Sequence, residues 1–297
     1  MKKVLLGAVA LSALGIAPAL AADLPVRTYT KAPVMVAAAY NWTGFYAGAN
    51  AGYGWENTQT NYNYTSFPAA NPPGFQDVFG PGGPLNVGGS SAVASALAQG
   101  FLPASLGNRQ AGVFTAGGQV GYNAQFNQYV LGVETDLNWM NGTKTTSFVA
   151  PPNGIITNVA SSTAGLRWLG TLRGRAGVAF DRALIYVTGG LAYGDAKASS
   201  NATNFDGANT DLFAGSVSGV RVGYTVGAGV EYAFTNNVSI KGEYLYYNLG
   251  SANYAVAPAN AIAAGEGITT VATQKFDGNI LRVGINYKFG GPIVAKY

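Results

Sequence analysis

The stretch of residues 281–289 reads Leu-Arg-Val-Gly-Ile-Asn-Tyr-Lys-Phe, with every large apolar side chain on an odd position and every charged or amide side chain on an even one. Successive side chains of a β-strand point to opposite faces of the sheet. One face is therefore apolar and ends in Tyr287 and Phe289, while the other carries Arg282 and Lys288. A closed barrel in lipid satisfies both faces, since apolar side chains face lipid and polar side chains face the lumen. The alternation predicts a transmembrane strand.

The beginning of the chain has the organisation of a secretory signal. Two lysines precede an apolar run that ends near Ala17, and Ala19-Leu20-Ala21 has the small-x-small form of a cleavage site. The run and its neighbour Pro18 do not make up the roughly 20 uninterrupted apolar residues that an anchor helix needs. We expect residues 1–21 to be a signal peptide, and the mature chain to be exported to the cell outer membrane.

Composition excludes several classes of function. Charged residues make up only 10% of the chain, against about 25% in ordinary soluble proteins. The formal charge of +4 includes the two lysines of the signal, so the mature chain carries 4 − 2 = +2, which is too little for a nucleic-acid partner. The chain has no cysteine and no histidine, and so lacks the commonest general base and metal ligand. We expect no enzyme activity, no metal and no cofactor.

A repeated unit organises the chain. Phe126, Phe180 and Phe234 stand 54 residues apart, each directly before a short polar turn, and Phe289 follows 55 residues later. Recurrence of a turn at a fixed interval indicates a repeated hairpin. Strands placed around these turns number eight, and they cover residues 44–56, 112–126, 129–142, 164–180, 183–197, 218–234, 238–250 and 274–289.

The connections between these strands alternate in length. Two- or three-residue turns lie at one end, and segments of about 57–111, 143–163, 198–217 and 251–273 lie at the other. Outer-membrane barrels have short periplasmic turns and longer extracellular loops. The predicted fold is all-β: an eight-stranded antiparallel up-and-down transmembrane β-barrel with four long extracellular loops and three short periplasmic turns.

Charged side chains share one face of the predicted strands. A charge on the lipid face costs about 2–4 kcal/mol at the bilayer midplane, and between the aromatic limits every charge falls on the opposite parity. The predicted lumen charge network consists of Glu134, Asp136, Arg167, Arg173, Arg175, Arg221, Glu231, Lys241, Glu243 and Arg282. For Arg282 we expect Glu243 on the neighbouring strand, or Glu134 and Asp136 across the lumen, as partners.

Aromatic residues of the opposite parity gather at two depths. Amphipathic rings favour both membrane interfaces, so two girdles are expected, one near the turns and one near the loops. The predicted lipid-interface aromatics are Phe45, Tyr53, Trp55, Tyr122, Phe126, Trp139, Trp168, Phe180, Tyr193, Tyr224, Phe234, Tyr244, Tyr287 and Phe289.

Two segments resemble a known family. Asn41-Trp42-Thr43-Gly44-Phe45-Tyr46-Ala47-Gly48 and Gly284-Ile285-Asn286-Tyr287-Lys288-Phe289 are similar to the alphaproteobacterial small outer-membrane β-barrel proteins, the RopB-type surface antigens, and more distantly to the OmpA-like barrel. The resemblance implies outer-membrane lipid, lipopolysaccharide and the outer-membrane assembly machinery as partners. Extracellular ligands or host surfaces follow from the same resemblance, because members are implicated in adhesion and haem capture.

The domain organisation follows from these segments. We expect a signal peptide at 1–21, a periplasmic N-terminal leader at 22–40, the barrel at 41–290 and a C-terminal tail at 291–297. The tail departs from the usual ending at a terminal aromatic, which leaves Phe289 and Tyr297 as two candidates for the assembly signal.

An eight-stranded barrel has an interior just wide enough for side chains to fill. The predicted function is therefore structural: a barrel whose salt-bridged lumen is filled and which contributes to envelope integrity and surface display. One alternative is a narrow porin, which the arginine excess among the predicted lumen charges would make anion-preferring. Another is a surface adhesin or haem-binding protein that uses the long first loop, residues 57–111.

Overall fold

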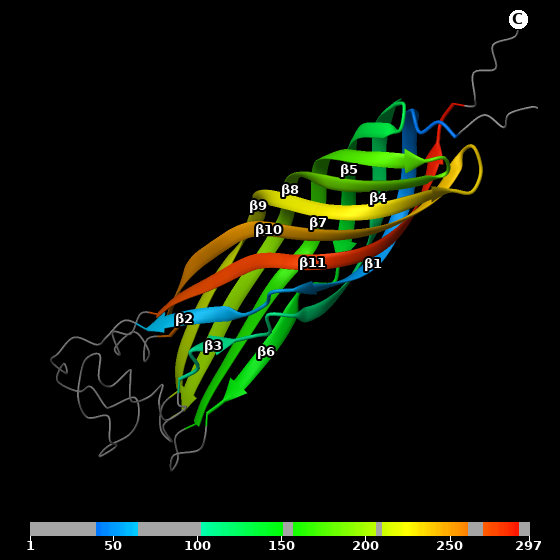
Figure 1. Cartoon of the computed structure of the whole chain (residues 1–297). Helices are drawn as coiled ribbons and strands as arrows, with labels where there is room; N and C mark the ends of the chain where they lie inside the picture. Colours follow the sequence, from blue (N-terminus) through cyan, green and yellow to red (C-terminus); the bar gives the residue numbers. More distant parts are fainter. Residues whose placement is uncertain (1–39, 65–101, 151–156, 206–209, 261–269, 291–297) are drawn as a thin grey trace, which may run out of the picture. The chain divides into compact units, whose positions relative to one another are not determined.

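The computed structural model describes residues 40–64, 102–150, 157–205, 210–260 and 270–290, which belong to one compact unit. Every regular element among them is a β-strand (Figure 1). No helix in this part of the chain is long and apolar enough to cross a membrane. The predicted signal peptide, nearly all of the leader, most of the first loop and the tail lie outside the described residues.

The strands form one antiparallel sheet that closes on itself. Consecutive members of the ring pair with each other, and the last pairs with the first, with Ala49 opposite Ile285. Closure removes the unpaired sheet edges that lipid cannot hydrate. The eight strands of the ring are β1 (Gly44–Glu56), β4 (Ala111–Phe126), β5 (Tyr129–Met140), β7 (Thr157–Phe180), β8 (Ala183–Phe205), β9 (Thr210–Ala233), β10 (Val238–Pro258) and β11 (Thr270–Lys288).

Short turns join the ring strands at one end, here called the turn end. Asn127 and Asp181 follow Phe126 and Phe180 and have φ values of 55° and 52°. Asn and Asp tolerate this left-handed conformation better than other residues with a side chain. In the third turn, the Thr235 hydroxyl accepts hydrogen bonds from the backbone amides of Asn237 and Val238. The three turns lie where the repeated phenylalanines predicted them.

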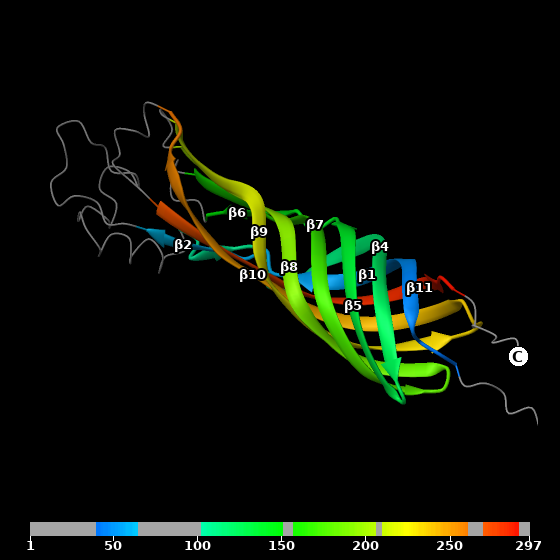
Figure 2. The ribbon, with the colours of Figure 1, turned by 90° about the horizontal axis from the view of Figure 1, so that it is seen from above.

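Several strands continue beyond their predicted ends at the opposite, loop end (Figure 2). β7 and β8 pair without a break in chain order from Phe180↔Ala183 out to Thr157↔Phe205, apart from one bulge. The predicted loops 143–163, 198–217 and 251–273 are therefore largely strand. These segments are rich in small and polar residues and lack the large apolar side chains of a lipid-facing strand, but outside a bilayer a strand needs no apolar face.

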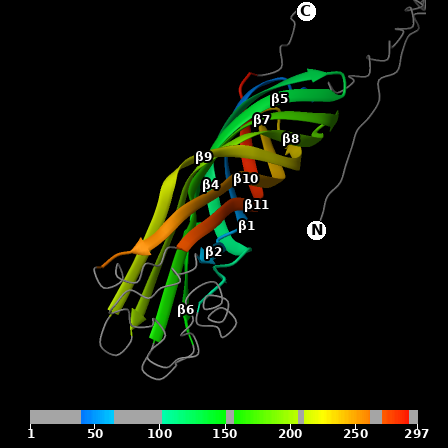
Figure 3. The ribbon, with the colours of Figure 1, turned by 90° about the vertical axis from the view of Figure 1, so that its left-hand side faces the viewer.

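Three short strands extend the sheet at the loop end. β2 (Thr60–Tyr64) pairs with β11, β3 (Ser105–Leu106) pairs with β2, and β6 (Lys144–Val149) pairs with β7. Figure 3 shows β2 beyond the end of β1 and alongside β11. Both ends of the predicted first loop thus begin as strands that add to the wall.

A bulge reverses the side-chain parity of β7. Register between β7 and β8 shifts between Leu166 and Leu169, next to Gly165, which has a φ of +145°. A Cβ on Gly165 would stand 2.1 Å from the carbonyl oxygen of Gly142. Leu166 and Leu169 consequently both point inward, and Arg167 points outward.

Candidate functional site: the filled lumen

Eight charged side chains meet inside the ring at mid-height, and we call them the charged layer. Alternation along the strands turns them inward, and each is at most 4% exposed. They come from five strands: β5, β7, β9, β10 and β11. The members are Glu134, Asp136, Arg173, Arg175, Glu231, Lys241, Glu243 and Arg282. All eight belong to the predicted network.

Arg173 lies at the centre of the charged layer. Its Nη2 donates to Asp136 Oδ2 at 2.9 Å, and its Nη1 donates to Glu243 Oε1 at 3.0 Å. The same guanidinium reaches Glu134, and its Nε donates to the Thr171 hydroxyl at 2.9 Å. One arginine thus links three carboxylates that come from two different strands.

Arg282 completes this part of the layer from β11. Its Nε donates to Glu243 Oε2 at 2.8 Å, directly across the β10–β11 pair, and its Nη2 donates to Asp136 Oδ2 at 2.9 Å across the lumen. Lys241 lies beside it, with Nζ 2.8 Å from both carboxylate oxygens of Glu134. Both kinds of partner expected for Arg282 are present.

A second cluster forms around Arg175, nearer the turn end. Its Nη2 donates to Glu231 Oε2 at 2.8 Å, and its Nη1 donates to the Tyr46 hydroxyl at 3.0 Å. The guanidinium also lies 4.0 Å from the centre of the Tyr186 ring. Tyr46 in turn donates to Glu134, which joins the two clusters.

Tyr46 and Tyr186 are functional members of the layer that the sequence analysis missed. Their hydroxyls donate to Glu134 at 2.7 Å and to Glu243 at 2.9 Å. The signal was present: Tyr46 shares its parity with Asn50, which is buried in the lumen. Tyrosine is amphipathic, which suits a membrane interface and equally suits a lumen where its ring packs against a guanidinium and its hydroxyl reaches a carboxylate.

The charges of this layer balance. Four carboxylates and four cations give 4 − 4 = 0, so no counter-ion is required inside. Buried ions lose their hydration, and that loss is offset only when they are paired and hydrogen-bonded. Each of the eight makes at least one charged contact within 3.0 Å. The layer is therefore a self-contained electrostatic unit.

A cap closes the lumen at the turn end. The backbone amides of Tyr40 and Trp42 donate to Asp181 Oδ1 at 2.9 Å and to Gln125 Oε1 at 2.7 Å, which folds the chain before β1 over the opening. Burial raises the pKa of Tyr40 to about 12. The cap consists of Tyr40, Trp42, Val130, Ala179, Leu184, Tyr186 and Ala233.

An apolar layer fills the lumen at the loop end. Residues of β4, β5, β7, β8, β10 and β11 meet there, and each is at most 7% exposed. Its larger members are Val113, Met140, Leu166, Leu169, Tyr247, Leu249, Tyr254, Val256, Phe276 and Ile280. The bulge in β7 is what turns both Leu166 and Leu169 into this layer.

One carboxyl group is buried on the loop-end side, apart from the charged layer. Glu56, the last residue of β1, has no exposed surface, and neither of its carboxylate oxygens makes a hydrogen bond within the described part of the chain. The Leu166 backbone and the charge of Lys144 favour the ionised form of Glu56, while its burial opposes that form. The Tyr247 hydroxyl is also buried without a hydrogen-bond partner among these residues. Glu56 was not among the predicted lumen charges.

Two predicted members of the network lie elsewhere. Arg167 is wrong as a lumen residue, because the bulge turns it outward, where its side chain is 62% exposed and forms an ion pair with Asp195. Arg221 has the inward parity but lies nearer the loop end than the charged layer. Its guanidinium lies 5.5 Å from the Phe276 ring, and its Nη1 donates to the Ser251 carbonyl oxygen at 3.0 Å.

The predicted interface aromatics lie on the outer surface. Eleven of the fourteen are at least 41% exposed, and Tyr122, Trp168 and Tyr193 are partly covered by neighbours. Adjacent rings pack together at both depths, as Phe45 does with Tyr122 and Trp168 does with Tyr193.

The spacing of the girdles fits a bilayer. Trp139 stands ten positions after Tyr129 on β5. With a rise of about 3.4 Å per residue and a tilt of about 40°, ten residues span a height of about 26 Å, close to the ~25 Å apolar band of outer-membrane barrels. Leu131, Val133 and Leu137 lie between the two rings and are all exposed.

Comparison with known proteins agrees with this geometry. Residues 7–289 match the family model described as "Outer membrane protein beta-barrel domain". The chain belongs to this family. It is thus an outer-membrane protein, with its turns on the periplasmic side and its loops on the extracellular side.

Relatives within the family come from alphaproteobacteria. The 31 kDa outer-membrane immunogenic protein of Brucella melitensis biotype 1 is 32% identical over 291 residues, covering 97% of this chain and 100% of the relative. The 22 kDa outer membrane protein of Rhizobium leguminosarum bv. viciae is 33% identical over 58% of this chain and 66% of the relative. Among solved structures, the crystal structure of Neisserial surface protein A matches with a TM-score of 0.33 and 13% identity, over 83% of this chain and 98% of that one.

Proposed function

We propose that this outer-membrane protein is a structural barrel with a closed lumen, which contributes to envelope integrity and displays its loops at the cell surface. The observation that carries the proposal is the charged layer, which is electrically neutral and hydrogen-bonded across the lumen. The protein's partners in the membrane are outer-membrane lipid and lipopolysaccharide, and the protein reaches the membrane through the outer-membrane assembly machinery.

The direction of the ion pairs supports a closed lumen. In the ring order β5 and β10 are four strands apart out of eight, so they face each other across the lumen. Lys241 on β10 contacts Glu134 on β5, and Arg173 on β7 contacts Glu243 on β10. An ion passing along the axis would have to separate these pairs, and separating a buried pair costs about 3–5 kcal/mol.

A narrow porin is the competing function. Its expected anion preference rested on an arginine excess that included Arg167 and Arg221. With those two outside the charged layer, the layer has equal numbers of carboxylates and cations. No contact among the described residues favours a conducting path over a closed one, and the porin therefore stays the alternative.

Conductance in planar bilayers tests the proposal. The refolded mature chain is expected to give no steady ion-step openings, and regular openings would overturn it. The double variant Arg173→Ala/Arg282→Ala removes two large side chains from the charged layer and is expected to introduce openings. Arg167→Ala removes an outward-facing arginine and serves as the matched control, which should stay closed. Heat-modifiable migration on gels verifies that each variant has formed a barrel.

Recognition of extracellular ligands by the first loop is a separate possibility. Residues 65–101 lie outside the described part, so adhesion and haem binding remain predictions from the family resemblance. Deletion of residues 65–101, which leaves β2 and β3 in place, is the corresponding experiment. Unchanged attachment and haem binding after this deletion would remove the loop from consideration. That the protein is not an enzyme likewise remains a prediction, based on the absence of histidine and cysteine.

A further inference from the structure

The wall of the barrel has an opening between β9 and β10. Pairing of these strands stops at Tyr224↔Asn248 and resumes only at Ala214↔Ala257. Over the intervening stretch β9 remains paired with β8, and most of β10 remains paired with β11. Each strand therefore presents one unpaired edge to the other. Gly250, with a φ of +77°, lies where β10 departs from the register.

The loop-end aromatic girdle shows at which depth of the membrane the opening lies. It begins directly beyond Tyr224, whose ring packs 6.2 Å from that of Tyr246 on the neighbouring strand. On the same side of the wall, Val220 and Val222 point outward and are 63% and 66% exposed. The opening thus lies where the headgroups of the outer leaflet begin. Polar lipid groups at this level can satisfy backbone edges that hydrocarbon cannot.

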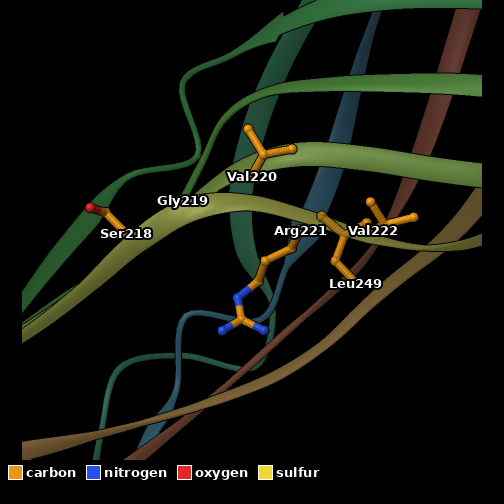
Figure 4. Close-up of a pocket in the computed structure, with 6 residues that line it drawn as sticks. All are labelled: Ser218, Gly219, Val220, Arg221, Val222 and Leu249. Carbon is orange, nitrogen blue, oxygen red and sulfur yellow. The ribbon is translucent and has the colours of Figure 1, made fainter.

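A pocket of about 360 Å³ occupies the opening, lined by Ser218, Gly219, Val220, Arg221, Val222 and Leu249 (Figure 4). Arg221 is the charged residue of this lining. Figure 4 shows its side chain extending away from the ribbon of β9, on the opposite side from Val220. Its Nη1 donates to the Ser251 carbonyl oxygen, so the guanidinium reaches from β9 to β10 across the opening.

Arg221 differs from every other arginine of the spanning strands in its partners. Arg173, Arg175 and Arg282 contact carboxylates in the lumen, and Arg167 contacts Asp195 on the outside. Arg221 has no carboxylate within ion-pair distance among the described residues, and the one hydrogen bond it makes there is to Ser251. A guanidinium has five N–H donors in a planar fork that matches the oxygens of a phosphate.

We propose that the opening between β9 and β10 binds the phosphate-bearing headgroup of an outer-leaflet lipid. Arg221 donates to the phosphate oxygens, and Val220 and Val222, which lie on the loop-end side of Tyr224, flank the headgroup. Charge-assisted bonds between arginine and phosphate are among the strongest that a protein surface offers. The site lies in the wall of the barrel and not in the lumen, so the test of lipid binding is independent of the test of lumen closure.

Native mass spectrometry of the refolded barrel, loaded with lipid A in detergent, measures this site. The Arg221→Gln variant is expected to retain lipid A at least about tenfold more weakly than the natural chain, because it loses the charge-assisted hydrogen bonds to the phosphate. Arg221→Lys keeps the charge without the fork and is expected to retain an intermediate amount. Arg167→Gln is the matched control, because it removes an arginine at a similar depth whose charge is already paired, and its retention should be unchanged.

Two further probes identify the source of the phosphate. Dephosphorylated lipid A should bind weakly to the natural chain and to Arg221→Gln alike, and inorganic phosphate should fail to displace lipid A at millimolar concentration. Equal retention of lipid A by the natural chain and Arg221→Gln would overturn the site. So would an equal loss in Arg167→Gln, or displacement by inorganic phosphate, because the binding would then be general electrostatics or a free-anion site. Heat-modifiable migration confirms folding of each variant before its spectrum is taken.

Discussion

The charged layer and the apolar layer fill the same lumen by different physical means. In the charged layer every ion has a partner, and the contacts cross from one side of the ring to the other. In the apolar layer the side chains exclude water without directional bonds, and the Glu56 carboxyl group buried on the same side has no hydrogen-bond partner among the described residues. Both layers fill the lumen, but only in the charged layer does the filling depend on hydrogen bonds and ion pairs between specific side chains.

The largest expected effect comes from removing the central cation. Arg173→Gln leaves Glu134, Asp136 and Glu243 close together with one positive charge fewer, and should lower the free energy of unfolding by about 3–5 kcal/mol. Reversible urea unfolding in detergent or lipid vesicles measures this change. In contrast, Arg167→Gln breaks an exposed pair and should cost less than about 1 kcal/mol. Similar losses in both variants would mean that the charged layer is no more than a set of surface-like pairs.

In the apolar layer, stability should depend on the side-chain volume that is removed. Leu166→Ala leaves a cavity at a fully buried position, and we expect a loss of about 2–4 kcal/mol in the same unfolding measurement. Leu172→Ala is the control, since Leu172 faces lipid on the same strand and can be replaced by lipid contacts. If the lipid-facing change proves as costly as the buried one, packing of the apolar layer is not what stabilises the loop end.

The smallest effect, and the one of opposite sign, concerns Glu56. A buried carboxyl group without a hydrogen-bond partner destabilises the fold whether it ionises without water or takes up a proton, and the neutral isostere in Glu56→Gln should raise the free energy of unfolding by about 1 kcal/mol at neutral pH. Asp136→Gln, which removes a paired carboxylate of the charged layer, should instead lower it by about 3 kcal/mol. A loss of stability in Glu56→Gln would show that Glu56 has a partner that compensates its burial.

Much of the wall could be predicted from the sequence. Parity along each strand places Leu281 and Val283 outside and Arg282 inside, because alternate side chains face lipid and the polar lumen, and apolar residues favour the lipid. The rule failed at Arg167, where an extra residue in the bulge exchanges the two faces. No local pattern distinguishes that stretch beforehand, since the decisive contact is between Gly165 and Gly142 on another segment.

The lumen could be predicted in content but only partly in pairing: the partners of Arg282 follow from the sequence, and those of the other cations do not. Alternation identifies which side chains enter the lumen, while the contacts across the lumen depend on the stagger of distant strands: Arg173 with Glu243 joins strands three positions apart in the ring, and Lys241 with Glu134 joins strands four positions apart. Glu56 escaped notice because it lies at the end of β1, where a charge would ordinarily reach water. The long ends of β8 and β9 escaped for a related reason: polar residues such as Thr203 and Asp211 pair as well as apolar ones once the strand has left the bilayer.

The reach of the cross-lumen ion pairs has a consequence for strand register. A slip of one residue would turn Arg282 into lipid, but a slip of two would leave every side chain on its proper face, so the lipid cannot detect it. Such a slip would move Arg282 by about 6.8 Å along the strand, out of reach of Asp136, which lies 146 positions earlier in the chain. The ion pairs thus discriminate between registers that hydrophobicity does not distinguish.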